Sequence, residues 1–354
     1  MLTAYDPLHG LTEKDTVLLA FSGGIDSSAA AYLTMQTGCR VRAVYMDLLP
    51  GKDLSRVKLV AEQLGIPLDI LDLSDAFREK VMRFCWEEYA AGRTPNPCAI
   101  CNPVFKFGVL TEYAKEQGCS ALVTGHYAQL HNGMLYRGAD RKKDQSYFLF
   151  GLREEQLSFS RFPLGAMTKE EVRQMVTELG LPNASDPESQ DICFASSELP
   201  VGELLRQTFH GKITPGVFTD MNGNTLGKHA GIHLYTPGQR KGTGVALGKP
   251  AYVRRIIPAE AKVELVTDQS FLMSSGLRFH GLVVHGTLPP SPFRALVQIR
   301  YRSLPVPAEI TCKEYGTGVI RFETPVRAVT PGQAAVIYDE DRQIAGGWIT
   351  DILP

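Results

Sequence analysis

The feature that most constrains the fold is a regular alternation, in the first half of the chain, of short β-branched segments with longer helical patterns. VLLAFS, VRAVYMD, LDILDL and ALVTGHY have the composition of buried strands, and helical segments such as DLSRVKLVAEQLG lie between them. Strands that alternate with helices of this length form parallel sheets covered by helices on both faces. The sequence therefore predicts a doubly wound parallel α/β domain over residues 1–207.

The character of the sequence changes after this part. Thr168 and Glu171 form a capping box for one more helix, and Gly180 marks its end. From Gly211 the chain is rich in Gly and turns, which predicts a small, largely β central domain over residues 208–270. Beyond Phe271, alternating segments such as ALVQIRYRS and GTGVIRFET predict a C-terminal β-barrel over residues 271–354.

Composition narrows the class of protein. The 354 residues are 44% hydrophobic and 21% charged, enough to bury more than one core. We expect a cytoplasmic protein without a membrane partner, because no secretory signal and no apolar run of ~20 residues is present. The formal charge of −1 gives no general attraction for a polyanion. RNA binding would therefore depend on local basic clusters, at residues 141–143, 239–241 and 300–302.

A glycine-rich turn directly after the first predicted strand is the strongest local signal. It reads SGGIDSS, from Ser22 to Ser28, and it opens a helix. Glycines let the backbone amides approach a phosphate, and the helix N-terminus adds partial positive charge. The simpler alternative is a tight strand-to-helix turn in which Asp26 only caps the helix. The motif predicts an anion-binding loop that lacks a Walker lysine.

Seven cysteines, an odd number spread over a long chain, argue against a disulfide framework. Cys98 and Cys101 follow two prolines in GRTPNPCAICN, so we expect both thiols on a constrained loop that precedes a helix. A nearby helix N-terminus would favour the thiolate, which makes Cys101 a candidate nucleophile. Cys193, in the segment SQDICF, is a third candidate. The remaining cysteines are expected to act as small hydrophobic residues: Cys39, Cys85, Cys119 and Cys312.

Nine segments, taken in order, resemble the tRNA-specific 2-thiouridylases of the PP-loop ATP pyrophosphatase superfamily: SGGIDSS, GRTPNPCAICN, FKFG, TGHYA, KDQSYFL, FPLG, SQDICF, TPGQRKG and a late TPGQ. The resemblance runs from the first strand to the last barrel strand. It implies a PP-loop domain, a small central domain and a C-terminal β-barrel. It also implies an enzyme that uses ATP and Mg²⁺ to adenylate the C2 oxygen of the wobble uridine and then replaces that oxygen with sulfur. The implied partners are tRNA and a sulfur donor, which is a relay protein, a cysteine desulfurase or free sulfide.

The same resemblance assigns the site residues. Asp26 is also a candidate Mg²⁺ ligand. Plain structural alternatives are a hydrogen-bonded buried histidine at position 126, a solvated turn at residues 141–143 and simple strand alternation around Tyr301. The ATP residues are Ala20, Phe21, Ser22, Gly23, Gly24, Ile25, Asp26 and Ser27, with Met46 and Gly125 near the adenosine; Asn96 and Pro97 face the target base, and His126, Lys143, Asp144, Gln145, Arg300, Tyr301 and Gln333 contact the tRNA.

The cysteine set departs from the usual pattern of the family. In the family Cys193 would carry a persulfide sulfur and Cys101 would be its partner thiol, but many members have an aspartate where this chain has Cys98. Cys98, Cys101 and Cys193 resemble the three ligands of a [4Fe-4S] cluster in related tRNA thiolation enzymes, in which one open iron accepts hydrosulfide. We therefore expect such a cluster. Metal-free persulfide and disulfide chemistry is one alternative, and a zinc or purely structural site is another.

Two other functions fit parts of the sequence. A PP-loop enzyme that adenylates a small molecule would need the phosphate loop, but neither a third cysteine nor a barrel with basic strands. A non-catalytic RNA-binding or iron-sulfur protein would not need an intact SGGIDSS. The combination of motifs therefore favours tRNA thiolation over both.

Overall fold

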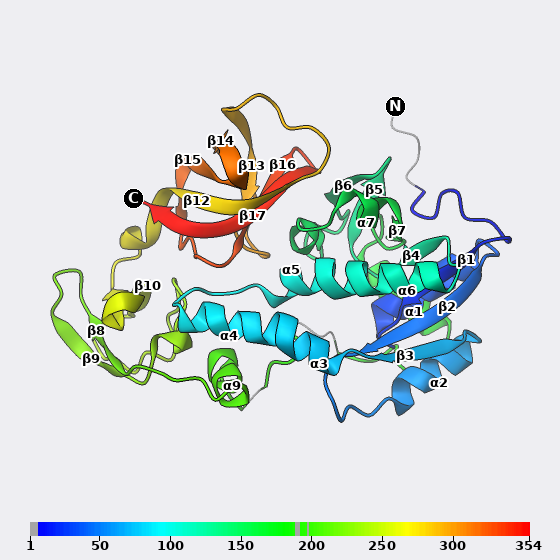
Figure 1. The fold of residues 1–354 in the computed structure, drawn as a ribbon, viewed down its shortest axis with the longest axis horizontal. Coiled ribbons are helices and arrows are strands. Elements are labelled where there is room, and N and C mark those ends of the chain that lie inside the picture. The colour runs from blue at the N-terminus through cyan, green and yellow to red at the C-terminus, as the bar shows by residue number, and fades with distance from the viewer. Residues whose placement is uncertain (1–5, 188–191, 197) are drawn as a thin grey trace.

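The computed structural model describes residues 6–187, 192–196 and 198–354. It consists of a parallel-sheet domain, a small middle sheet and a C-terminal barrel (Figure 1), which confirms the predicted fold class. Ser189, Gln190 and Asp191 of the SQDICF segment lie outside the described residues. In the described part of the chain, no helix has the length and apolar character needed to cross a membrane.

The first sheet has five parallel strands in the order β3-β2-β1-β4-β7. Val17 and Leu19 of β1 pack into one apolar cluster with α1, α2 and α8, whereas Leu18 packs into a second cluster with α6 on the opposite face. Helices therefore cover both faces, as the alternation predicts. The elements are β1 (Thr16–Ala20), α1 (Ile25–Met35), β2 (Arg40–Asp47), α2 (Ser55–Leu64), β3 (Leu68–Asp72), β4 (Ala121–Val123), α7 (Glu154–Ser158), β7 (Ser160–Arg161) and α8 (Lys169–Glu178).

Two long helical segments connect β3 to β4 and run side by side across the molecule (Figure 1). Each contains a π-helical stretch, a geometry that is often found at functional sites. The loop between them reaches the barrel, where the Thr94 backbone N–H donates to the Pro331 carbonyl at 2.9 Å. The first segment comprises α3 (Ser74–Phe77), η1 (Arg78–Met82) and α4 (Arg83–Ala90), and the second comprises α5 (Pro97–Cys101), η2 (Asn102–Val109) and α6 (Leu110–Glu116).

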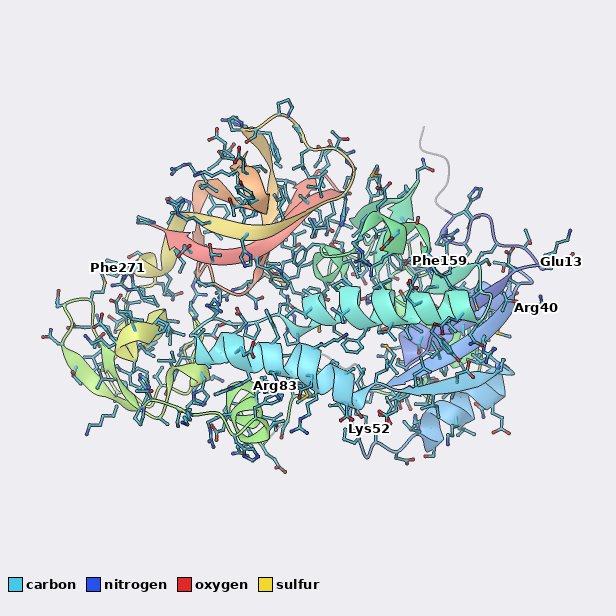
Figure 2. All side chains as sticks on the ribbon, in the orientation of Figure 1. Glu13, Arg40, Lys52, Arg83, Phe159 and Phe271 are labelled. Carbon is cyan, nitrogen blue, oxygen red and sulfur yellow. The ribbon has the colours of Figure 1, made fainter. Side chains whose placement is uncertain are left out.

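The middle domain is a four-stranded sheet in the order β10-β11-β8-β9. Its core contains Phe218 and Val263, and its buried Glu264 is held by Arg254 at 2.6 Å and Arg255 at 3.0 Å. Phe271 is exposed where the chain leaves this domain for the barrel (Figure 2). The elements are α9 (Val201–Thr208), β8 (Gly216–Thr219), β9 (Thr225–His229), η4 (Ile232–Leu234), β10 (Tyr252–Ile257), η5 (Pro258–Glu260), β11 (Lys262–Val266) and η6 (Gln269–Leu272).

Six antiparallel strands form the barrel, which the pairing of β12 with β17 closes. A hairpin from the first domain, β5 (Ala128–His131) and β6 (Met134–Arg137), extends this sheet at β17. Strand β13 ends at Gln298, so Tyr301 lies in the following turn; its expected place on a strand is wrong. The barrel elements are β12 (Met273–Val284), β13 (Phe293–Gln298), β14 (Val306–Cys312), η7 (Glu314–Gly316), β15 (Gly318–Arg327), β16 (Ala334–Asp339) and β17 (Arg342–Leu353).

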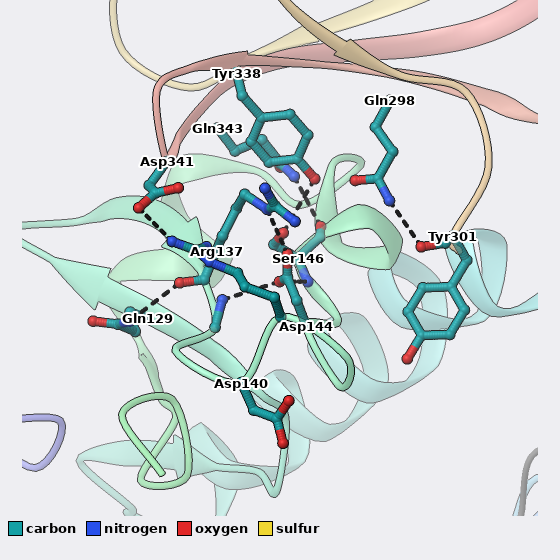
Figure 3. A network of polar contacts seen from close by, with 12 residues as sticks. Gln129, Arg137, Asp140, Asp144, Ser146, Gln298, Tyr301, Tyr338, Asp341 and Gln343 are labelled. Carbon is teal, nitrogen blue, oxygen red and sulfur yellow. Dashed lines mark hydrogen bonds and ion pairs between the residues drawn. The ribbon is translucent and has the colours of Figure 1, made fainter. Parts of the chain in front are cut away.

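Buried polar groups join the barrel to the first domain (Figure 3). Arg137 of β6 lies 2.7 Å from Asp144, whose carboxylate also accepts the backbone N–H groups of Gly138 and Ser146. The Ser146 hydroxyl, on η3 (Ser146–Leu149), lies 3.1 Å from the hydroxyl of Tyr338 in the barrel. The Gln343 side chain of the barrel also donates from Nε2 to the Ser146 carbonyl at 2.8 Å. The ion pair of Arg137 and Asp144 thus holds Ser146 in place, and Ser146 contacts the barrel through both its hydroxyl and its carbonyl.

Replacing Arg137 with methionine is expected to destabilise the protein by about 3 kcal/mol, because Asp144 would keep a buried charge without its cation. The side chains of Arg137 and Asp144 are only 13% and 5% exposed. Urea unfolding measures the change. The matched control is Arg153→Met, whose surface ion pair with Glu155 should contribute less than about 1 kcal/mol. Equal unfolding midpoints for the two variants would contradict the assignment of the network.

Candidate functional site

The phosphate loop lies at the carboxyl edge of the parallel sheet, where ligands of such folds bind. Gly24 precedes the first residue of α1, and the hydroxyls of Ser27 and Ser28 both donate to its carbonyl at 3.0 Å. Gly23 has a φ of +74°, and a Cβ there would lie 3.1 Å from Val57. Both conditions require glycine at position 23.

Asn183 supports this loop from behind, a role that the sequence gave no reason to expect. Its fully buried side chain donates from Nδ2 to the Gly23 carbonyl and to the Ser28 hydroxyl, both at 2.8 Å. Asn183 lies ten residues before Cys193. One short segment therefore links the phosphate loop to a candidate sulfur carrier.

A cavity of about 320 Å³ opens at the ends of β1, β2 and β4. Most of the predicted ATP residues line it, and Cys193 lines it with them. Lys106, from the FKFG segment, also lines it and was not singled out by the sequence. The predicted residues in its lining are Ala20, Phe21, Ser22, Asp26, Ser27, Met46, Gly125, His126, Gln145 and Cys193.

A second cavity, of about 790 Å³, lies between the first domain and the barrel. Ser22, Asp26 and Gln145 line both cavities, so the two meet at the phosphate loop. Phe148 also lines the second cavity and stacks on Tyr301, with ring centroids 4.4 Å apart. The predicted residues in its lining are Ser22, Gly24, Ile25, Asp26, Asn96, Pro97, Cys98, Lys143, Gln145, Tyr301 and Gln333.

Cys98 and Cys101 lie within a helix, so the predicted loop position of the two thiols is wrong. Helix α5 begins at Pro97, and the side chain of Asn96 caps it by accepting the Ala99 backbone N–H at 3.2 Å. Proline is well suited to the first position of a helix, because its missing N–H would have no partner there. The second proline of the motif therefore starts a helix instead of preventing one.

Burial raises the pKa of all three candidate thiols, and it raises the pKa of Cys101 to about 12. The positive charge of Lys106 acts in the opposite direction on each of them but is outweighed. Cys98 and Cys193 are exposed to the cavities, whereas Cys101 is buried in an apolar cluster with Phe194. The expected thiolate at Cys101 is thus wrong for the unliganded chain, because desolvation exceeds the effect of the helix N-terminus.

Among the described residues, no group of three or more His, Cys, Asp or Glu side chains is placed to hold a metal ion. The three thiols share one region of the molecule, because the charges of Cys98 and Cys193 both act on the pKa of Cys101. Cys85, expected to be a small hydrophobic residue, is fully buried in the apolar cluster that contains Cys101. Cys39 and Cys119 are also buried, and Cys312 is half-buried on the barrel.

Three of the predicted tRNA residues have internal partners. His126 is buried with Nδ1 2.7 Å from the Thr124 hydroxyl, and burial lowers its pKa well below the usual range. Asp144 belongs to the network around Arg137 and lines neither cavity. The half-buried Arg300 guanidinium donates to the carbonyls of Pro237 and Ala328 at 2.8 Å and to the Thr330 hydroxyl, which ties the barrel to the middle domain.

The parallel-sheet domain, the middle sheet and the barrel each match a known family of protein domains. The tRNA methyl transferase HUP domain model matches residues 15–197, the tRNA methyl transferase PRC-barrel domain matches residues 203–267, and the aminomethyltransferase beta-barrel domain matches residues 274–349.

Similar curated proteins identify the family of the whole chain. The tRNA-specific 2-thiouridylase MnmA of Syntrophotalea carbinolica is 42% identical over 346 residues, which span 94% of this chain and 98% of the relative. The same enzymes of a Synechococcus species and of Acetivibrio thermocellus are each 39% identical, over 95% of this chain and 97% and 99% of their own lengths. The chain belongs to the tRNA-specific 2-thiouridylase MnmA family.

The raised pKa values predict slow alkylation at neutral pH. At pH 7 a thiol with a pKa of about 12 is ionised to only about one part in 10⁵. Iodoacetamide should therefore modify Cys98 and Cys193 at least about tenfold faster than the buried Cys101, and all three rates should rise with pH. Peptide mass spectrometry measures the rates, with Cys85 as the buried control. If Cys101 reacted as fast as Cys98 at pH 7, the buried, protonated state of Cys101 would be contradicted.

Proposed function

We propose that the protein 2-thiolates the wobble uridine of tRNA and converts ATP to AMP and pyrophosphate. The observation that carries the proposal is the meeting of the two cavities at the phosphate loop. One cavity contains Cys193 and the predicted adenosine residues, and the other contains Asn96 and Cys98. Activation of a base and delivery of sulfur to it can therefore occur at one place.

ATP would bind with its phosphates on the amides of the loop from Ser22 to Ser27 and its adenosine near Met46 and Gly125. Asp26 lines both cavities and is the proposed ligand of Mg²⁺, which neutralises phosphate charge when bound. An acidic side chain at the loop is the donor that Mg²⁺ prefers. No further ligand is assigned.

The larger cavity would accept the flipped uridine and its neighbours. Asn96 and Pro97 lie at its base at the start of α5, and the stacked Phe148 and Tyr301 offer an aromatic surface. Gln333 donates from Nε2 to the carbonyls of Thr94 and Pro95 at 3.0 and 3.1 Å, which holds the loop that leads to Asn96. Lys143, Gln145 and Tyr301 would contact the nucleotides from the rim.

The chemistry follows in three displacements, at phosphorus, at carbon and at sulfur. The C2 oxygen of uridine attacks the α-phosphorus, the bond from phosphorus to the bridging oxygen breaks, and its electron pair leaves with pyrophosphate. The terminal sulfur of a Cys193 persulfide then attacks C2, and AMP leaves with the original oxygen. The Cys101 thiolate attacks the inner sulfur, which releases 2-thiouridine and forms a Cys101–Cys193 disulfide. A persulfide donor, either a relay protein or a cysteine desulfurase, supplies the sulfur, and an external dithiol reduces the disulfide.

The positions of the thiols favour this persulfide route over the expected cluster. Phe194, which follows Cys193, packs in the same apolar cluster as Cys101, so the two cysteines are held in one region. Among the described residues, no three-ligand group is placed to hold a single metal ion, which disfavours the zinc alternative. In the rival route a [4Fe-4S] cluster on Cys98, Cys101 and Cys193 would use free sulfide.

Loss of either reacting thiol should stop sulfur transfer without preventing activation. Cys101→Ser and Cys193→Ser are expected to lower 2-thiouridine formation at least about 10³-fold, because each thiol forms or breaks a bond. Release of pyrophosphate in the first turnover should continue in both variants. Cys312→Ser, on the barrel, is the control. Absence of ATP- and tRNA-dependent AMP formation by the wild type would refute the proposed function itself.

Cys98→Asp separates the two sulfur routes. In the persulfide route this substitution restores the residue that many family members carry and should leave activity within about tenfold of the wild type. In the cluster route it removes a ligand and should abolish both bound iron and activity. Iron and acid-labile sulfide are measured in protein purified without oxygen. About four irons per chain in the wild type, lost in this variant together with activity, would overturn the persulfide proposal.

A further inference from the structure

The phosphate loop has no lysine of its own, yet cleavage of ATP leaves a highly charged pyrophosphate. Lys169, the first residue of α8, places its ammonium at this loop, with Nζ 2.5 Å from Oδ1 of Asp26. We propose that Lys169 is the phosphate-binding lysine of the site. It pairs with Asp26 in the nucleotide-free protein and donates to the β- and γ-phosphates when ATP is bound. This inference rests on the proposed function.

The position of Lys169 is fixed through its backbone. Thr168 caps α8 by accepting the Glu171 backbone N–H at 3.2 Å, and the predicted capping box is confirmed. The backbone N–H of Lys169 donates to Oδ2 of Asp140 at 3.1 Å. Asn183, which follows the same helix, holds Gly23 and Ser28. Asp140 thus holds the first residue of α8, the segment after α8 holds the phosphate loop, and the lysine side chain extends from a fixed point.

The surroundings of the ammonium are those of a binding group. Tyr127 donates its hydroxyl to Asp26 Oδ1 at 2.8 Å, and the Lys169 ammonium lies 5.8 Å from the centre of the Tyr127 ring. Lys169, Asp26 and Tyr127 all line the larger cavity together with Ser22 and Gly24 of the loop. The Lys169 side chain is only 13% exposed. A partly buried ion pair contributes little net stability, because desolvation offsets the attraction of the charges. The position of Lys169 beside the phosphate loop is therefore better explained by binding of an anion than by stability.

Four other lysines line the two cavities. Lys143 is a predicted tRNA contact, and Lys52 lies near Cys193, where its charge opposes the rise in the pKa of that thiol. The charge of Lys106 opposes the rise in the pKa of Cys98, Cys101 and Cys193. This charge therefore lies near the proposed sulfur chemistry. Lys142 is exposed at the rim of the larger cavity. Lys169, in contrast, forms an ion pair with Asp26 of the phosphate loop. Lys169 is therefore the cation best placed for the phosphates.

The role of Lys169 belongs to the activation step. When the C2 oxygen of uridine attacks the α-phosphorus, the electron pair of the broken bond stays on the bridging oxygen of pyrophosphate. The ammonium donates hydrogen bonds to this leaving group and stabilises its new charge, and no proton needs to be transferred. Release of the ammonium from Asp26 leaves that carboxylate available for its own proposed part in nucleotide binding.

The test compares Lys169→Met and Lys169→Gln with the wild type and with Lys115→Met. Lys115 is a surface lysine of α6 that pairs with Glu112 and touches neither cavity. Affinity for inorganic pyrophosphate with Mg²⁺ is measured by calorimetry, tRNA-dependent AMP formation is followed as a function of ATP concentration, and thermal unfolding is recorded. Glutamine retains a hydrogen-bond donor for Asp26, so it keeps the test open if the methionine variant does not fold.

Both Lys169 variants are expected to bind pyrophosphate at least about tenfold more weakly and to form AMP about 100-fold more slowly, while Lys115→Met stays within about twofold. A folded Lys169 variant that binds pyrophosphate as tightly as the wild type would overturn the inference. If the unfolding temperature of that variant fell as well, the ion pair of Lys169 with Asp26 would have a structural role only. Failure of the wild type to form AMP would instead refute the proposed function, and the pyrophosphate measurement would still decide the role of Lys169.

Discussion

The attachment of the barrel to the parallel-sheet domain is the constraint on which the site depends. The larger cavity has one wall from the phosphate loop and α5 and another from the turn after β13 and from Gln333. Two sets of polar contacts join these walls: the Ser146 hydroxyl with that of Tyr338, and the contacts of Gln333 and Pro331 with the Thr94–Pro95 backbone. An apolar interface of similar size would permit sliding, whereas these directional contacts permit one arrangement.

Much of the fold could be predicted because its signals are local. The alternation of strands and helices specifies a parallel sheet, and glycine at position 23 specifies a backbone turn that no other residue adopts easily. The capping box at Thr168 specifies where α8 begins. Each of these signals acts through residues that are close in the chain, so the sequence alone is enough to predict the local structure.

The errors have two origins. The prolines predict a loop at Cys98 and Cys101, but Pro97 occupies the first position of a helix that its neighbour Asn96 caps, a local signal that the sequence contains. The other errors come from residues that are distant in the chain. The thiolate expectation for Cys101 neglected the apolar cluster that Phe194 and other distant residues build around it. Lys169, Asn183 and Phe148 escaped notice because their importance comes from partners far away in the chain.

The protonated state of the thiols is consistent with the order of the proposed reaction. A permanent thiolate at Cys101 would react with oxidants, or with the Cys193 persulfide before its terminal sulfur had reached the base. Burial keeps Cys101 neutral, and Lys106 lies where it can favour ionisation once the surroundings change. Asn183 holds the phosphate loop through Gly23 and Ser28, and it precedes Cys193 by ten residues in the sequence.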